Sequence, residues 1–224
     1  MKLYMHPVST AARPVRMLIA ENGIKCGEEV VDILKGAHYQ EPYASMNPNR
    51  LVPMLEDGDF RLTEGSAILK YLADKYDLPS YPKDPKKRAK VNETMDWINA
   101  QLYLHLGYGL VYPQIFPHHK RRSDEAQAGT IAWGQQGAKR WLQVLNDHWI
   151  GPKNQYLCGN DLTIADHFGA AVVSIGELIG CDFSAYPNIK RWLDNMKKLK
   201  SWGQVNEMFN GFVAANKGKE FVGV

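Results

Sequence analysis

The stretch Asp77-Leu78-Pro79-Ser80-Tyr81-Pro82-Lys83-Asp84-Pro85 separates two parts of the chain that differ in pattern. Three prolines fall within seven residues, and proline neither donates a backbone hydrogen bond nor fits a helix interior. Neither a helix nor a paired strand is expected to continue through it. We therefore predict a first domain over residues 1–77, a linker over residues 78–85 and a second domain over residues 86–224.

The part before the linker alternates between strand and helix patterns. We expect, in chain order, a strand near 2–5, a helix over 11–22 closed by Gly23, a strand near 29–33, a short helix around 40–45, strands at 53–56 and 60–62, and a helix over 64–76. Asp57-Gly58-Asp59 between the last two strands is a tight-hairpin signal. The predicted order is β-α-β-α-β-β-α, an α/β domain.

The part after the linker shows helical periodicity only, which predicts an all-α domain. The expected helices cover residues 85–116, 124–149, 163–179, 187–199 and 202–212. Thr163-Ile164-Ala165-Asp166 has the pattern of a capping box, and the apolar residues after it predict a helix buried in the middle of the bundle.

Composition excludes several classes of protein. With 224 residues, a net charge of +3, 23% charged and 45% hydrophobic residues, the chain is neither disordered nor a nucleic-acid-coating protein. Its three cysteines are scattered without a Cys-x-x-Cys, so we expect no disulfide framework and no metal site. No signal peptide or membrane span is expected, and we predict a cytoplasmic location.

Three short segments are candidates for a binding site. Ser9-Thr10 follows the first strand, where free amides and the positive end of a helix favour an anion, although a hydroxyl there also serves as a simple helix cap. Val52-Pro53 opens a strand and has the option of a cis peptide bond. Thr63-Glu64-Gly65-Ser66-Ala67-Ile68 starts a helix with an acidic residue, a glycine and a hydroxyl.

Taken together, these segments resemble the glutathione site of the cytosolic glutathione transferases, and the resemblance extends over nearly the whole chain. Leu3-Tyr4 through Ser9 and Arg13 is similar to the opening of the serine-type (theta- and delta-like) classes and their bacterial relatives. Asn47-Pro48 with Val52-Pro53 resembles the cis-proline turn of the family, and Glu64-Gly65-Ser66-Ala67-Ile68 its Glu-Ser-x-Ala-Ile motif. The resemblance implies a thioredoxin-like first domain, an all-helical second domain and a homodimer.

The resemblance also implies a role for each site residue. Ser9 would donate its hydroxyl hydrogen to the glutathione sulfur as the catalytic residue. The remaining glutathione contacts would come from His38 and Arg50 at the glycyl carboxylate, Val52 and Pro53 at the cysteinyl unit, Glu64 at the γ-glutamyl ammonium, and Gly65 and Ser66 at the γ-glutamyl carboxylate. Glutathione would be a co-substrate, with no metal required.

Two positions depart from the family pattern. Gly65 stands where the family usually has serine, which removes one side-chain donor for the carboxylate, and Ser66 is the candidate to compensate. Tyr103 stands where theta-class members carry an arginine that reaches the active site.

The second substrate is expected to bind between the two domains. Tyr103, Tyr108, Tyr112 and Phe116 follow at roughly helical spacing and predict an aromatic wall, with His6 contributing from the end of the first strand. Each ring also has an alternative role as ordinary helix-packing core. His118 and His119 lack metal-ligand partners at suitable spacing, so we expect them in a solvated loop.

The sequence therefore predicts a glutathione transferase that adds glutathione to a small apolar electrophile or displaces halide with it. Two alternatives stay open. One is a glutathione-dependent dehalogenase, isomerase or peroxidase on the same scaffold, and the other is a binding module without useful activity.

Overall fold

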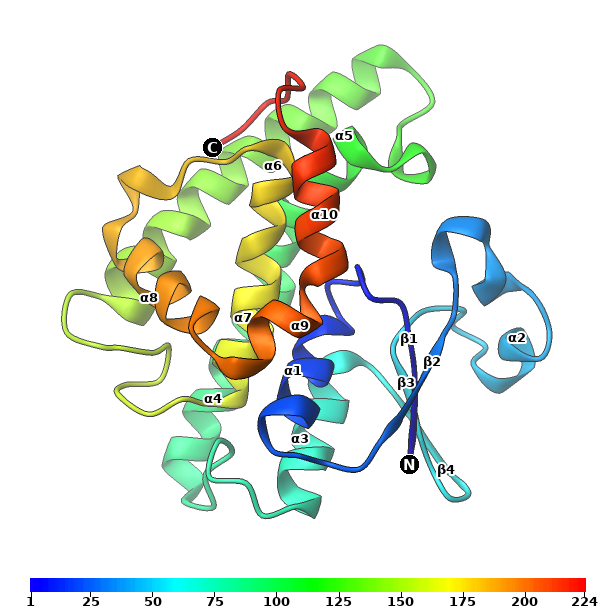
Figure 1. Ribbon diagram of the computed structural model, residues 1–224. Coiled ribbons are helices and arrows are strands. Elements are labelled where there is room, and N and C mark those ends of the chain that lie inside the picture. Colours follow the sequence, from blue (N-terminus) through cyan, green and yellow to red (C-terminus); the bar gives the residue numbers. More distant parts are fainter.

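A four-stranded mixed sheet organises the first part of the chain in the computed structural model, which describes residues 1–224 (Figure 1). The strands, in the spatial order β2-β1-β3-β4, are β1 (Lys2–Met5), β2 (Gly27–Val30), β3 (Met54–Asp57) and β4 (Phe60–Thr63). β1 pairs parallel with β2 and antiparallel with β3, and β3 and β4 form the expected hairpin. The predicted order of elements along the chain, β-α-β-α-β-β-α, is confirmed. β2 begins two residues before the expected segment because its exposed residues lack an apolar pattern to mark the start.

Three helices accompany the sheet, namely α1 (Arg13–Glu21), the short α2 (Tyr43–Met46) and α3 (Gly65–Lys75). α1 and α3 pack together, between the sheet and the helical part of the molecule (Figure 1). Side chains alternate across a strand, so Leu3 and Met5 of β1 join the main core, while Tyr4 packs with Tyr43 and Met54 on the opposite face of the sheet. The sheet is therefore covered on both faces.

The rest of the chain is helical, as predicted. Its elements are α4 (Pro85–Trp97), the π-helical η3 (Ile98–Val111), α5 (Tyr112–Ile115), α6 (Asp124–Val144), the π-helical η5 (Leu145–Ile150), α7 (Ile164–Ser174), α8 (Pro187–Lys197), α9 (Lys200–Val205) and α10 (Glu207–Asn216). Short 3₁₀ turns lie at η1 (Ile33–Lys35), η2 (Ala37–Tyr39), η4 (Pro117–His119), η6 (Ile175–Ile179) and η7 (Phe183–Ala185). Residues 76–84 contain no helix or strand. No helix combines the length and apolar character needed to cross a membrane.

The segment 202–212 differs from the prediction of one helix. It holds α9 and α10, separated at Asn206. The Asn206 side chain is fully buried, where its Nδ2 donates to the Trp202 carbonyl at 2.9 Å and its Oδ1 accepts from the Arg13 guanidinium at 2.8 Å. Arg13 and Asn206 are 193 positions apart in the chain. The local pattern of apolar residues therefore cannot predict this contact.

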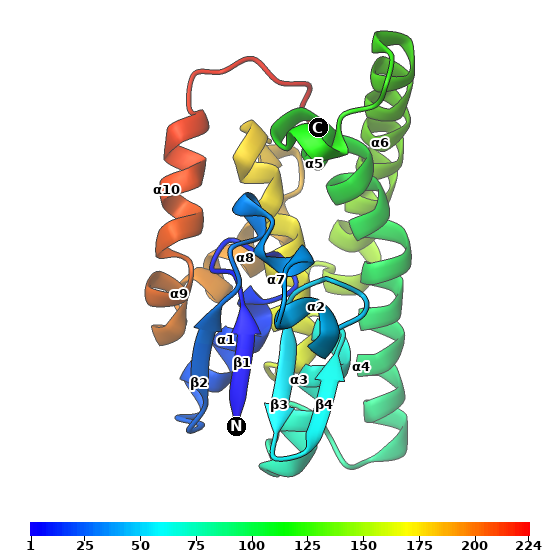
Figure 2. The same cartoon turned by 90° about the vertical axis from the view of Figure 1, so that its right-hand side faces the viewer.

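α7 runs through the middle of the helical part, with every residue buried (Figure 2). Its capping box forms as predicted, with Asp166 Oδ2 accepting from the Thr163 amide at 2.8 Å. Asp166 Oδ1 also accepts from the Leu157 amide at 2.8 Å and from Trp192 Nε1 of α8 at 2.9 Å. One buried carboxylate therefore holds together the start of α7, the preceding loop and α8.

Arg13 joins the two parts of the molecule. Its side chain is fully buried at the start of α1, and its guanidinium donates to the Ala171 carbonyl at 2.8 Å and to Ser174 Oγ at 3.2 Å, both in α7. The guanidinium carbon also lies 3.8 Å from the centre of the Phe209 ring in α10.

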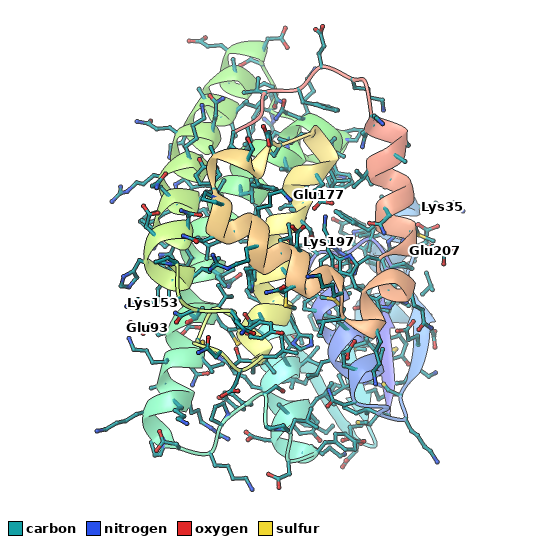
Figure 3. The ribbon with its side chains drawn as sticks, turned by 60° about the vertical axis from the view of Figure 1, so that its left-hand side comes forward. Lys35, Glu93, Lys153, Glu177, Lys197 and Glu207 are labelled. Carbon is teal, nitrogen blue, oxygen red and sulfur yellow. The ribbon has the colours of Figure 1, made fainter.

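Ion pairs on the outer face of the molecule involve only two side chains. Lys197 and Glu177, for example, lie 2.7 Å apart and are labelled in Figure 3.

Candidate functional site

A cavity of about 570 Å³ lies between the sheet-containing part and the helices. Its lining includes twelve of the thirteen residues predicted for the site, namely Ser9, His38, Arg50, Val52, Pro53, Glu64, Gly65, Ser66, Tyr103, Tyr108, Tyr112 and Phe116. These residues come from the turn after β1, the 3₁₀ turn η2, the segment before β3, the start of α3, and the run from η3 through α5 to Phe116. The fold thus gathers segments that are far apart in the chain around one space.

His6 is the exception, and its placement in the pocket is corrected. Its side chain is buried at the end of β1 and is not part of the cavity wall. Nδ1 accepts from the Val8 amide at 3.4 Å, and Nε2 lies 3.8 Å from the Asp32 carboxylate. Burial lowers the pKa of His6, while Asp32 opposes that shift. The imidazole therefore helps to hold the turn after β1 through the Val8 amide, and it lies outside the cavity wall.

Ser9 presents its hydroxyl at the cavity wall. Its Oγ accepts from the Ala12 amide at 3.3 Å, so the helix-capping role is present in weak form. Accepting a hydrogen bond leaves the hydroxyl hydrogen available for donation. The carbonyl of Ser9 accepts from the Ala12 and Arg13 amides, whereas the amides of Thr10 and Ala11, which also line the cavity, donate to no protein acceptor. The turn therefore presents two backbone amides and one hydroxyl to the cavity.

Thr10 is placed differently. Its side chain is 6% exposed, and Oγ1 lies 2.7 Å from the Tyr112 hydroxyl oxygen, which in turn lies 2.7 Å from the Tyr103 hydroxyl oxygen. Three hydroxyl groups therefore form a buried chain between the turn and the helices. The Thr10 hydroxyl is therefore engaged in this buried chain, whereas the Ser9 hydroxyl contacts only the Ala12 amide and lies at the cavity wall.

The segment before β3 is held by two side chains that meet at one carbonyl. The Leu51 carbonyl accepts from the Tyr43 hydroxyl at 2.5 Å and from Asn47 Nδ2 at 2.8 Å. The Val52–Pro53 peptide bond is cis, the option that the sequence left open. His38 lies across from this segment on η2, with a buried Nδ1 that has no hydrogen-bond partner. Burial, together with the nearby His118, lowers the pKa of His38.

The start of α3 forms part of the cavity wall. Glu64 precedes the helix with a φ of 66°, and Gly65 and Ser66 follow in the cavity wall. A Cβ at position 65 would lie 2.5 Å from the carbonyl oxygen of Ala11, well inside van der Waals contact. Glycine at this position therefore has a steric reason, namely that α3 approaches the Ser9 turn too closely for a side chain.

The aromatic wall forms as predicted, but its rings have different environments. Ring centres are 5.2 Å apart for Tyr103 and Tyr108, 5.2 Å for Tyr108 and Tyr112, and 5.5 Å for Tyr112 and Phe116. Tyr103 and Tyr112 are buried, and burial raises the pKa of Tyr112 to about 12. Tyr108 is 44% exposed. The rings therefore divide between the two expected roles. Tyr103 and Tyr112 are buried at the edge of the core, whereas Tyr108 is partly exposed in the cavity wall.

His118 and His119 also line the cavity, which the sequence did not predict. They form η4 directly after α5, and the His119 ring centre lies 5.2 Å from that of Tyr112. A signal was present, because His119 follows Phe116 at one-turn spacing. Other lining residues that the sequence did not predict include Phe168, Leu178, Phe209 and Phe212 from α7, η6 and α10, which no local motif connects to the site.

No three histidine, cysteine, aspartate or glutamate side chains converge in a way that would hold a metal ion. Burial raises the pKa of Cys26, Cys158 and Cys181, the last to about 11. These thiols are therefore poor nucleophiles at neutral pH, since the thiolate is the reactive form.

Comparison with known proteins agrees with the family resemblance that the sequence shows. The chain matches the glutathione S-transferase N-terminal domain over residues 1–74 and the glutathione S-transferase C-terminal domain over residues 115–200. It is 33% identical to human glutathione S-transferase theta-1 over 86% of this chain and 80% of that protein. It is 30% identical to glutathione S-transferase D7 of Drosophila melanogaster over 98% of this chain and 92% of that protein. Among solved structures, the unclassified glutathione S-transferase 2 of Bombyx mori is 30% identical, covers 99% of each chain and superposes with a TM-score of 0.82.

Proposed function

The chain belongs to the glutathione S-transferase family, and on that premise we propose that it uses Ser9 to stabilise the glutathione thiolate for attack on a small apolar electrophile. One observation carries the proposal. The Ser9 hydroxyl, with a free hydrogen, lies at the cavity wall beside the unpaired amides of Thr10 and Ala11. The reaction is conjugation or halide displacement, in which the sulfur lone pair forms the new S–C bond.

The rest of the polar lining suits a peptide with two carboxylates and one ammonium group. Glu64 is the acidic residue of the lining and is the proposed partner of the γ-glutamyl ammonium. The α3 start at Gly65 and Ser66 offers donors to the γ-glutamyl carboxylate. Arg50 and His38 are the proposed partners of the glycyl carboxylate, with Val52 and Pro53 beside the cysteinyl unit.

The required stabilisation is within reach of these groups. Lowering a thiol pKa from about 8.5 to about 6.5 needs about 2.7 kcal/mol of preference for the thiolate. A hydrogen bond to a charged group contributes about 1.5–3 kcal/mol, and a helix N-terminus adds about 0.3–1 kcal/mol. Ser9 therefore remains un-ionised and acts as a donor. Tyr103, in the place of the theta-class arginine, adds no positive charge, and its hydroxyl is already bonded to Tyr112.

An ultraviolet titration of the thiolate of bound glutathione tests this role in wild type, Ser9→Ala and the matched control Thr10→Val. We expect the thiol pKa to rise toward its free value in Ser9→Ala and to stay low in Thr10→Val, whose hydroxyl is bonded to Tyr112. Calorimetric binding of glutathione checks that both variants retain the peptide. A thiol pKa that is unchanged in Ser9→Ala, with glutathione bound, would remove Ser9 from the mechanism.

We also propose that the protein resides in the cytoplasm and that its domain boundaries lie at residues 77 and 86.

We propose in addition that the chain forms a homodimer. The large apolar side chains that are exposed include Leu104 of η3 and Trp133 of α6, at 43% and 47%, and we place the proposed interface on these two helices, which pack against each other. Light scattering of wild type and Trp133→Glu tests the dimer. A monomeric mass for the wild-type protein would contradict it.

A further inference from the structure

His119 places an imidazole within the aromatic wall of the cavity. Its ring centre lies 5.2 Å from that of Tyr112, 5.7 Å from that of Tyr108 and 6.3 Å from that of Phe116. No protein group forms a hydrogen bond with either ring nitrogen, and the residue lines the cavity. A polar group with unused hydrogen-bonding capacity in an otherwise apolar wall is available to a ligand.

Two other polar groups of this wall are already engaged with protein partners. The hydroxyls of Tyr103 and Tyr112 belong to the buried chain that ends at Thr10. Burial raises the pKa of Tyr108, and the charge of Glu64 adds to that shift. His119 differs from the Tyr103 and Tyr112 hydroxyls because its ring nitrogens have no protein partner.

His119 lies near the Ser9 turn, so both can contact one electrophile molecule. Thr10, next to Ser9, contacts Tyr112 through a hydrogen bond, and the Tyr112 ring neighbours His119. Only one aromatic ring therefore separates the imidazole from the turn. An electrophile whose reacting carbon approaches the sulfur to about 3–3.5 Å would extend its far end along this ring.

The charge state of His119 selects the kind of group that it recognises. Burial lowers the pKa of His119, and the neighbouring His118 and Arg121 lower it further. At neutral pH the ring is therefore neutral, with one N–H donor and one acceptor nitrogen. A neutral donor matches a carbonyl oxygen better than it matches a carboxylate, which needs a cation.

We propose that His119 donates a hydrogen bond to the carbonyl oxygen of the electrophile, which makes the site selective for α,β-unsaturated carbonyl compounds over alkyl halides of equal length. The inference rests on the proposed function, because glutathione thiolate is the nucleophile. The sulfur forms a bond to the β-carbon, and the π electron pair of the double bond moves to give an enolate. The enolate takes one proton from solvent, so the reaction is a net addition without a leaving group.

His119 stabilises the charge that develops on the carbonyl oxygen during this step. A donor aimed at developing negative charge is worth more in the transition state than in the ground state. Halide displacement has no such oxygen, since the negative charge leaves with the halide ion. The two substrate classes therefore respond differently to loss of the donor.

The test compares trans-2-hexenal with 1-bromohexane, two six-carbon electrophiles, in wild type and in His119→Phe, His119→Gln and His118→Phe. The readout is the ratio of kcat/KM for the enal, followed by loss of its absorbance, to kcat/KM for the bromide, followed by bromide release. We expect the ratio to fall about tenfold or more in His119→Phe, in line with loss of one donor to an oxyanion. His119→Gln keeps an N–H donor and is expected to recover at least half of the wild-type ratio.

The outcomes separate this inference from the proposed function. An equal fall in His119→Phe and His119→Gln would show a role for ring shape alone and would overturn the donor role. The donor role would also be overturned if the ratio fell equally in His118→Phe, the exposed neighbour. An unchanged ratio in His119→Phe would overturn it as well. A wild-type protein that turns over neither compound would instead contradict the proposed function, and calorimetric binding of glutathione to each variant establishes that the site is folded.

Discussion

The hydroxyl oxygens of Thr10 and Tyr112 lie 2.7 Å apart, although 102 residues separate them in the chain. This contact joins the turn after β1 to α5 and occupies the hydroxyl of Thr10. The adjacent Ser9 lies at the cavity wall, and its Oγ accepts only from the Ala12 amide. One tertiary hydrogen bond therefore distinguishes two neighbouring hydroxyls that the sequence leaves equivalent.

Tyr112→Phe tests whether this hydroxyl chain is structural. The substitution removes the central hydroxyl, so the buried groups of Thr10 and Tyr103 both lose their partner. We expect a loss of about 1–3 kcal/mol in the free energy of unfolding, measured by urea denaturation, because an unsatisfied buried polar group costs about that much. The thiol pKa of bound glutathione should stay at its wild-type value. A raised thiol pKa would show that the chain acts on the sulfur directly.

Gly65→Ala tests the close approach between α3 and the Ser9 turn. The new methyl group would lie 2.5 Å from the Ala11 carbonyl oxygen, so the helix or the turn must move. We expect a stability loss of about 1–3 kcal/mol from overpacking and glutathione binding that is about tenfold weaker, equal to about 1.4 kcal/mol. Gly129→Ala in α6 is the control, because its Cβ would meet nothing within 4 Å. That variant should be unchanged or slightly more stable. Equal behaviour of the two variants would refute the steric reason for glycine.

Arg13→Lys tests the buried cation that joins the domains. The lysine keeps the charge but lacks the fork that reaches Ala171, Ser174 and Asn206 together. Burial already lowers the pKa of Arg13 to about 10, which shows how strongly its surroundings disfavour an unpaired charge. We expect a loss of about 2–4 kcal/mol in stability by urea denaturation, since each broken bond leaves a buried acceptor. Arg61→Lys, in a largely exposed pair with Glu56, is the control and should lose less than about 1 kcal/mol.

His167 predicts a dependence of stability on pH. Burial lowers the pKa of this imidazole, and its Nε2 has no hydrogen-bond partner. Below pH 6.5, roughly, the unfolded chain binds a proton that the folded protein excludes, so the stability present at neutral pH falls as the pH decreases, by at most about 1.4 kcal/mol per pH unit. His167→Asn keeps a donor toward the Thr163 carbonyl and removes the titration. Between pH 6.5 and 5.5 we expect wild type to lose about 1 kcal/mol more than the variant.

The other histidines with lowered pKa values, His6, His38 and His119, are present in both proteins and cancel in that difference. Parallel pH profiles for wild type and His167→Asn would contradict the prediction.

Local sequence patterns predict the order of the strands and helices, the proline-rich break between residues 76 and 84, and most of the predicted residues that line the cavity. These features are local. Prolines interrupt the chain at residues 79–85, the Asp57-Gly58-Asp59 turn makes a hairpin, and the Thr163 capping box starts α7. The Ser9, Val52 and Glu64 segments reach one cavity because each lies at the end of a strand or the start of a helix in a regular topology.

The division of roles between neighbouring side chains depends on contacts between distant segments of the chain. Whether Ser9 or Thr10 has the free hydroxyl depends on Tyr112, whether position 65 tolerates a side chain depends on the Ala11 carbonyl, and the helix break at Asn206 depends on Arg13. The inclusion of His119 in the wall and the exclusion of His6 likewise follow from packing between distant segments. Each of these outcomes is a contact between atoms far apart in sequence, and periodicity reports only on neighbours within a few turns.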